Sequence, residues 1–373
     1  MDFELSDEQA MLRDTAREAL GRTYDIETLR AVTDTELGWS REVWTSLAEI
    51  GILGLLFDEA HGGMGAGVEE LSAVLGEFGA TLAPEPFLDS VVVPGLLVER
   101  SGADAATKSA FLAPLAQGER LAAFAHLEAG DRWPHFAVGT TASDDAVLNG
   151  TKTLVAHGDC ADVLVVSARN ADGTVGLYVV EADAAGVERT AYRTHDRRRG
   201  AKVVFTDAAA TRVGDDDATA IIEGVQLVEQ AALCAEAVGA MTKSLAMTVD
   251  YLKARKQFGV PLATFQALTH RAADMYAALE LASSMHVYLT AALADGSADA
   301  VTGSRAKLQI CRSGRLIGQE SVQMHGGIGV TAEYPIGHYL SRLTAISHTL
   351  GDADAHLAFL SARLGDWDMV SAG

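Results

Sequence analysis

Two short motifs in the C-terminal third of the chain combine residue types that are suited to holding a phosphate-bearing cofactor. One reads Arg-Lys-Gln-Phe-Gly and is followed by a glutamine, and the other reads Gln-Met-His-Gly-Gly-Ile-Gly. Arginine offers phosphate a planar fork of donors, and glycine leaves backbone N–H groups open to an anion. The two motifs therefore predict a site for an anion such as a pyrophosphate, with Arg255 in one motif and Gly326 and Gly327 in the other.

Glu229 lies in the sequence Gln-Leu-Val-Glu-Gln, and local sequence favours a solvated residue near the positive end of a helix. His348, Asp352 and His356 are spaced by four and would align as metal ligands on one helix, but Gly351 interrupts that helix. No metal site is therefore predicted.

Helical periodicity shows how these residues are positioned. Long Pro-free segments at roughly 218–255, 262–294 and 301–324 predict helices. The first motif then lies at the corner between two helices, and the second follows the end of the third. Near the N-terminus, Ser6 and Gln9 have the spacing of a capping box, which predicts a helix start.

The order of helices, strands and helices predicts an α+β protein with three domains. Residues 1–117 form an all-α domain, 118–212 a middle β domain and 213–373 a helical domain. Short apolar runs in the middle segment predict strands, and Asn149-Gly150 is predicted to be a hairpin turn between two of them.

At the two cofactor motifs the chain resembles the acyl-CoA dehydrogenase family, and the resemblance extends over nearly its whole length. It implies a helical domain, a β-barrel-like domain and a C-terminal four-helix bundle. It also implies that six residues hold the ADP part of FAD. Arg255 would contact the pyrophosphate, Phe258 and Gln266 would line the adenosine side, and Gln323, Gly326 and Gly327 would contact phosphate or ribose. In that family these residues serve the FAD of the neighbouring subunit.

The chain departs from the family pattern where the flavin ring and the substrate would lie. A Thr or Ser normally faces the ring at the position of Leu127, and a Trp-Ile-Thr/Ser sequence is replaced here around Leu154 and Ala156. The usual catalytic glutamate corresponds to Gly351, and Asp352, one residue away, is a weak candidate base because its side chain is short. A minority of the family has its base on an earlier helix, near the position of Glu229, so the resemblance makes Glu229 the other candidate base.

This combination resembles the small, non-catalytic subunits of heteromeric bacterial acyl-CoA dehydrogenases, such as chains labelled pimeloyl-CoA dehydrogenase small subunit. The resemblance implies α,β-dehydrogenation of an acyl-CoA by an α2β2 complex with a catalytic partner, FAD, and an electron-transfer flavoprotein or similar acceptor. Dicarboxylyl, fatty and steroid-derived acyl-CoA substrates remain open. The alternatives are a self-sufficient homo-oligomer that uses Glu229 as its base, and a non-enzymatic scaffold.

Composition excludes several other classes. The formal net charge of −22 disfavours binding to nucleic acid or to an anionic membrane surface. The three cysteines lack the spacing of a zinc site or a disulfide framework, which fits a reducing compartment. The N-terminal sequence Met-Asp-Phe-Glu-Leu has no signal-like apolar core, and we expect a cytoplasmic protein without a membrane span.

Three further polar features have structural interpretations. The basic triplet Arg197–Arg199 is interpreted as a solvated turn rather than as a site for a CoA phosphate. Glu236 lies among small apolar residues and is predicted to pair with an arginine, because buried carboxylates are normally paired. His325 is predicted to contact a nearby carbonyl group.

Overall fold

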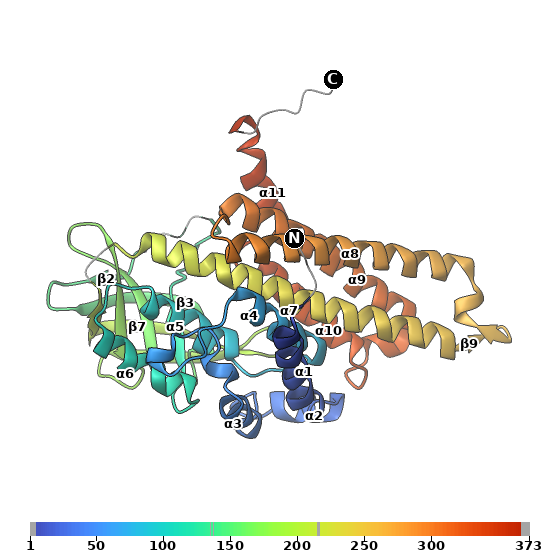
Figure 1. Ribbon diagram of the computed structural model, residues 1–373, viewed down its shortest axis with the longest axis horizontal. Coiled ribbons are helices and arrows are strands. Elements are labelled where there is room, and N and C mark those ends of the chain that lie inside the picture. Colours follow the sequence, from blue (N-terminus) through green and yellow to red (C-terminus); the bar gives the residue numbers. More distant parts are fainter. Residues whose placement is uncertain (1–4, 135, 137, 215–216, 367–373) are drawn as a thin grey trace.

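A computed structural model describes residues 5–134, 136, 138–214 and 217–366. The N-terminal sequence Met-Asp-Phe-Glu and the outer ends of the first and last predicted domains lie outside these residues. The described chain runs from helices through a sheet to long helices, which confirms the predicted α+β class (Figure 1).

The N-terminal part is helical: α1 (Asp7–Gly21), α2 (Ile26–Thr33), α3 (Arg41–Glu49), α4 (Val68–Thr81), α5 (Val93–Glu99) and α6 (Ala105–Ala116). The predicted capping box is confirmed, since Ser6 Oγ accepts from the backbone N–H of Gln9 and the Gln9 side chain accepts from the N–H of Ser6. Two 3-10 turns (Ile52–Gly54 and Glu59–His61) join α3 to α4, and a π-helical turn (Leu88–Val92) precedes α5. Such turns often occur at functional sites.

The middle segment is an eight-stranded sheet with the order β6-β7-β3-β2-β4-β5-β8, and β1 pairs in parallel with β4. Its strands are β1 (Ala122–Ala125), β2 (Thr141–Ala142), β3 (Val147–Ala156), β4 (Val163–Arg169), β5 (Val175–Glu181), β6 (Val187–Arg193), β7 (Arg199–Ala209) and β8 (Thr211–Val213). The predicted hairpin turn at Asn149-Gly150 is wrong, because both residues lie inside β3 at a shift in register against β7. An added Cβ at Gly150 would lie 2.6 Å from Thr140 Cα, so the glycine serves close packing there.

The C-terminal part is a bundle of α7 (Thr219–Ala254), α8 (Gln266–Ala294), α9 (Ala300–His325) and α10 (Ile336–His348), followed by α11 (Ala353–Ser361). A small hairpin, β9 (Lys256–Gln257) and β10 (Val260–Pro261), and a 3-10 turn (Leu262–Thr264) join α7 to α8. Further 3-10 turns follow α9 (Gly326–Val330) and α11 (Leu364–Asp366).

α4 crosses α7 at close range through glycines. An added Cβ at Gly79 would lie 1.8 Å from the carbonyl oxygen of Glu236, and one at Gly239 would lie 1.9 Å from that of Gly76. Only a residue without a side chain fits at these contacts. The crossing fixes the N-terminal helices against the bundle.

α8 contains a long apolar window with few charged residues. By length and composition alone it could cross a membrane, which is weak evidence because a bundle helix meets the same criterion. It packs along α9 and α7. Only 33% of its most apolar window is buried, so an apolar face remains on the outside.

Candidate functional site

The corner between α7 and α8 presents the first motif to solvent. Arg255 follows the last residue of α7, and its side chain is exposed. Phe258 is 92% exposed and has a left-handed backbone, with φ of 53°. Gln266 is the exposed first residue of α8. An exposed phenylalanine beside a guanidinium and an amide is a surface suited to another molecule.

The second motif lies at the C-terminal end of α9. Gln323, Gly326 and Gly327 are exposed, and an added Cβ at either glycine would have no heavy atom within 4 Å. Gly326 has a φ of 64°, which suits a residue without a side chain. The backbone here is therefore open to an approaching phosphate.

Aromatic stacking brings the two motifs to the same end of the bundle. The ring of His325 lies 4.4 Å from that of Tyr251, which is one turn before Arg255. His325 Nδ1 lies 2.7 Å from the carbonyl oxygen of Ser321, as the prediction of a carbonyl contact requires. The six exposed motif residues thus lie at the same end of the bundle, and we call them together the lending surface: Arg255, Phe258, Gln266, Gln323, Gly326 and Gly327.

A separate cavity lies at the opposite end of α7. α7 has 36 residues and is therefore about 54 Å long at about 1.5 Å per residue. Glu229 lies about three turns into the helix and lines the cavity, whereas Arg255 lies beyond its last residue. In Figure 1 the sheet lies at one end of this helix and β9 at the other. The lending surface therefore lies far from the cavity of its own chain.

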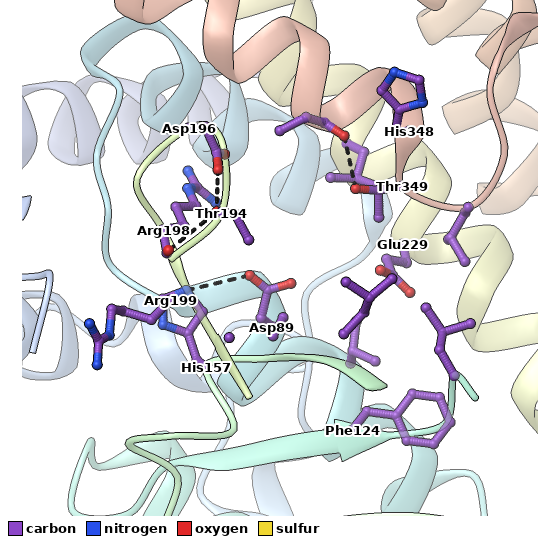
Figure 2. Close-up of a pocket in the computed structure, with 18 of the residues that line it drawn as sticks. Asp89, Phe124, His157, Thr194, Asp196, Arg198, Arg199, Glu229, His348 and Thr349 are labelled. Carbon is purple, nitrogen blue, oxygen red and sulfur yellow. Dashed lines mark hydrogen bonds and ion pairs between the residues drawn. The ribbon is translucent and has the colours of Figure 1, made fainter. Parts of the chain in front are cut away.

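The cavity has a volume of about 400 Å³ and lies between the sheet, the π-helical turn, α7 and α10. Figure 2 shows that Asp89 enters it from the π-helical turn and Glu229 from α7, on opposite sides. Phe124 lies on the wall that the sheet provides. This is the space where sheet and bundle meet, so it is the candidate ligand cavity of the chain.

A buried ionic network forms one side of the cavity. Arg342, on α10, donates to both carboxylate oxygens of Glu236 at 2.7 and 2.6 Å, and to Asp196 at 2.8 Å. Arg198 donates to Glu236 at 2.7 Å and to the carbonyl oxygen of Ala83 at 3.1 Å. The predicted arginine partner of Glu236 is confirmed. The network joins the N-terminal helices, the loop between β6 and β7, α7 and α10.

Charge compensation controls the protonation of this network. Burial raises the pKa of Asp196, but Arg342 and Arg198 outweigh burial and lower it to about 2. The same balance of burial against Arg198 and Arg342 leaves the pKa of Glu236 below its usual value. Both carboxylates are therefore ionised at neutral pH and paired with the two arginines.

The interpretation of the basic triplet as a solvated turn is wrong. Each arginine has an acidic partner far away in sequence: Arg197 pairs with Asp34, Arg198 with Glu236, and Arg199 with Asp159. The side chains of Arg198 and Arg199 are only 12% and 13% exposed. Arg197 and Arg198 therefore stabilise contacts between domains, and Arg199 stabilises a contact within the middle domain.

Glu229 has the environment of a perturbed carboxyl group. Burial, together with the negative charge of Asp89, raises the pKa of Glu229 to about 8 even though Lys307 opposes the shift. Burial likewise raises the pKa of Asp89, against Arg198 and Arg342. The alternative of a merely solvated Glu229 is wrong, because this side chain lines the cavity.

The position of the family's usual base is closed to any side chain. Gly351 has a φ of 96°, and an added Cβ would lie 2.9 Å from His356 Nε2 and 3.0 Å from Trp133 Cε3. Asp352 accepts from the N–H of Ala355 at 2.9 Å as the N-cap of α11 and is not among the residues that line the cavity. As the weaker catalytic candidate, Asp352 is thus occupied by capping.

Lys307, which sequence reasoning did not single out, fixes the same turn. It is fully buried, and its Nζ donates to the carbonyl oxygens of Ile346 and Thr349 at 2.8 Å and of Gly351 at 3.1 Å. Sequence offered one signal: Lys307 shares an apolar helical stripe with Ile310. Asp89 and His157 also line the cavity, and no motif identified them as site residues.

Two of the three residues spaced by four near α11, Asp352 and His356, have other contacts. His356 Nε2 lies 3.0 Å from the carbonyl oxygen of Leu350, and its ring packs on Trp133. Among the residues that the structure describes, no group of three or more His, Cys, Asp or Glu is arranged to hold a metal. Asp352 and His356 instead stabilise the turn before α11.

The sheet wall offers a flavin few side-chain donors. Leu127, Leu154 and Ala156 line the cavity, and none carries a side chain that can donate a hydrogen bond. The carbonyl oxygen of Leu127 already accepts from the N–H of Thr153 at 2.7 Å. The lending surface thus has exposed groups of the kind that bind a pyrophosphate, whereas these three positions of the cavity wall offer a flavin ring no side-chain donor.

Comparison with known proteins identifies the class. The acyl-CoA dehydrogenase N-terminal domain matches residues 6–119, and the acyl-CoA dehydrogenase C-terminal domain matches residues 220–365. The chain belongs to the acyl-CoA dehydrogenase family. The acyl-CoA dehydrogenase IpdE2 of Mycolicibacterium smegmatis is 30% identical over 363 residues, which cover 96% of this chain and 100% of that protein.

Two solved structures with this fold are complexes of unlike chains by their names. A variant of the Tcur3481-Tcur3483 steroid ACAD is 32% identical, with a TM-score of 0.88 and coverage of 96% of this chain and 98% of that chain. The ChsE4-ChsE5 complex from Mycobacterium tuberculosis is 26% identical, with a TM-score of 0.90 and coverage of 99% and 100%.

Proposed function

We propose that this chain is the flavin-lending, non-catalytic subunit of a heteromeric acyl-CoA dehydrogenase. Its lending surface contacts the ADP part of an FAD that is bound mainly by a catalytic partner subunit, in an α2β2 assembly in the cytoplasm. Arg255 pairs with the pyrophosphate, and the backbone at Gly326 and Gly327 supplies N–H donors. The partner chain contributes the catalytic base.

One observation carries this proposal: the two halves of a flavin site are preserved to opposite degrees in the same chain. At one end of α7, Arg255 and the open glycine turn are exposed and ready for phosphate. At the other end, the wall of Leu127, Leu154 and Ala156 lacks side-chain donors. A homo-oligomer of such chains would combine intact lending surfaces only with deficient ring sites.

The outer face of α8 supports an assembly. Tyr276 and Leu281 are each 58% exposed and Tyr288 is 44% exposed, although all three are large apolar or aromatic residues. They lie on the helix whose first residue, Gln266, belongs to the lending surface. A partner subunit whose FAD contacts the lending surface would also cover the outer face of α8.

The reaction of the complex is α,β-dehydrogenation of an acyl-CoA thioester, for which bound FAD supplies the oxidising power. The electrons leave to an electron-transfer flavoprotein or a similar acceptor. The name of the similar steroid ACAD favours a bulky steroid-derived CoA ester over a dicarboxylyl-CoA as the substrate.

The test is flavin retention in the complex with the partner chain. Arg255→Ala removes the charged phosphate contact, and Lys253→Ala is the matched control because Lys253 is an equally exposed cation two residues earlier. A charge-assisted hydrogen bond is worth about 1.5–3 kcal/mol, so Arg255→Ala weakens FAD binding by about 10- to 100-fold. Equal FAD affinity in the two variants would contradict the proposal.

A second function has one observation in its favour. Glu229 points into the cavity with a pKa near 8, as a general base in a self-sufficient dehydrogenase would. Such an enzyme needs stoichiometric FAD in the isolated chain and loses turnover in Glu229→Gln. Normal turnover in that variant excludes Glu229 as the base.

A further inference from the structure

The cavity at the sheet end of α7 remains open although its wall is poorly suited to a flavin. Its volume of about 400 Å³ lies within the range of small-molecule pockets, about 300–1,000 Å³. The network of Arg342, Arg198, Glu236 and Asp196 borders this space without filling it. A well-packed interior tolerates few empty spaces of this size, so an occupant is expected.

The surfaces that define the cavity are mainly apolar. Val93 contributes from α5, Phe124 and Leu154 from the sheet, and Leu233 from α7. Leu154 is 64% exposed and has a left-handed backbone, with φ of 51°. An exposed leucine in a strained conformation at the cavity indicates an apolar contact that the isolated chain does not complete.

Two histidines and two carboxylates contribute to the polar part of the lining. His126 and His157 are 6% and 1% exposed, and among the described residues His126 Nε2 and both ring nitrogens of His157 are closed to solvent without a hydrogen-bond partner. His157 Nε2 lies 3.8 Å from Asp89, and Glu229 faces Asp89 across the cavity. Both carboxylates are partly exposed, so a ligand oxygen in the cavity can reach them, whereas it cannot reach the buried ring nitrogens.

The charges around the cavity restrict the ligand. The arginines are already paired with Glu236 and Asp196, so they offer an anion no free partner. An anionic ligand would also approach the negative charge of Asp89. A cation would lose its hydration against apolar walls while Arg198 and Arg342 lie nearby. An uncharged molecule avoids both penalties.

We propose that this cavity binds an uncharged, mainly apolar molecule with a hydroxyl group, which occupies the space that a flavin ring would take in a catalytic chain. The hydroxyl contacts the carboxyl group of Glu229 on the α7 side of the cavity, since a hydroxyl both donates and accepts. The apolar body lies against Phe124, Leu154 and Leu233. The complex would thus carry a second small-molecule site in its non-catalytic subunit.

This inference rests on the proposed function only in that the chain holds no flavin of its own in the cavity. The visible flavin absorbance of each sample distinguishes a failure of this inference from a failure of the proposed function. Stoichiometric FAD that excludes the probe would overturn both proposals. A flavin-free chain that does not bind the probe would overturn this inference alone, and the lending surface would be unaffected.

The probe is 1-decanol, titrated calorimetrically into the full chain at neutral pH, with decanoate and decylammonium as charged probes of equal chain length. We expect one 1-decanol per chain and about tenfold weaker binding of each charged probe, because its charge must be desolvated. Binding of decanoate or decylammonium as tightly as 1-decanol overturns the proposal, as does no binding of 1-decanol.

Variants locate the binding. Ala156→Trp fills the cavity and is expected to weaken 1-decanol binding by at least about tenfold, whereas Ala277→Trp on the exposed face of α8 leaves it unchanged. If Ala156→Trp does not fold, Ala345→Phe fills the same cavity from α10. Glu229→Leu weakens binding, and Glu229→Gln, which keeps a donor and an acceptor, retains it. Equal binding in the filled variant and its control would overturn the assignment.

Discussion

Removal of Arg342 tests whether the buried ionic network holds the domains together. Arg342→Leu deletes three charge-assisted hydrogen bonds, two to Glu236 and one to Asp196. Loss of one partner from a buried ion pair costs about 3–5 kcal/mol. Arg198 keeps its bond of 2.7 Å to Glu236, so we expect the lower end, about 3 kcal/mol.

A second substitution separates the unpaired charge from lost packing. Glu236→Leu combined with Arg342→Leu leaves one cation, Arg198, beside one anion, Asp196. We expect the double variant to be destabilised by about 2 kcal/mol less than the sum of the single effects, since neighbouring sites couple. Urea unfolding at neutral pH, with circular dichroism as the readout, measures all three variants against the parent chain.

The pH dependence of the free energy of unfolding gives an independent check on the role of the network. The folded pKa of Asp196, about 2, lies below its unfolded value. Its contribution is therefore fully present above the unfolded pKa and is lost as pH falls toward 2. In Arg342→Leu the carboxyl groups take up protons at higher pH, which relieves their unpaired charge. The stability deficit of the variant should shrink between pH 7 and pH 3, and a constant deficit, or one below about 1 kcal/mol at pH 7, would refute the reasoning.

Further predictions concern the turn, the cavity and the assembly. Lys307→Met leaves three buried carbonyl groups without their donor and should lower the free energy of unfolding by about 3 kcal/mol or more in urea titrations. Gly351→Ala should cost about 1–3 kcal/mol in the same assay because of its φ of 96° and the nearby side chains, whereas Gly21→Ala, with open space around it, should not destabilise. The folded pKa of Glu229 is raised to about 8, so the fold favours its neutral form. The free energy of unfolding should therefore fall as the pH rises from the unfolded pKa of this group to 8. Glu229→Gln should remove this fall, which urea midpoints at pH 5 and pH 8 would measure. Leu281→Glu on the exposed face of α8 should weaken assembly with the partner chain in native mass spectrometry without lowering the melting temperature of the isolated chain.

Local patterns were sufficient for much of the fold. The Ser6 capping box begins α1 as predicted, and the three long periodic segments became α7, α8 and α9. The long helices also placed the two cofactor motifs at helix ends. Sequence could not show that these ends meet, because the stacking of His325 on Tyr251 depends on how α9 packs against α7.

The failures share a physical cause, which is dependence on distant partners. Asn149-Gly150 has the composition of a turn, but close packing of Gly150 on Thr140 places it within a strand. The basic triplet has the composition of a solvated loop, but Arg198 finds its carboxylate on α7. Asp89 carries no local signal, and only the meeting of the π-helical turn with the sheet and α7 makes it a cavity residue.

The most direct test of the central claim is the flavin content and native mass of this chain purified alone after incubation with excess FAD. If the chain lends only the outer half of a flavin site, the protein should retain far less than one FAD per chain, whatever its oligomeric state. Retention of about one FAD per chain in a homo-oligomer would show that the sheet wall holds a flavin, and would contradict the account.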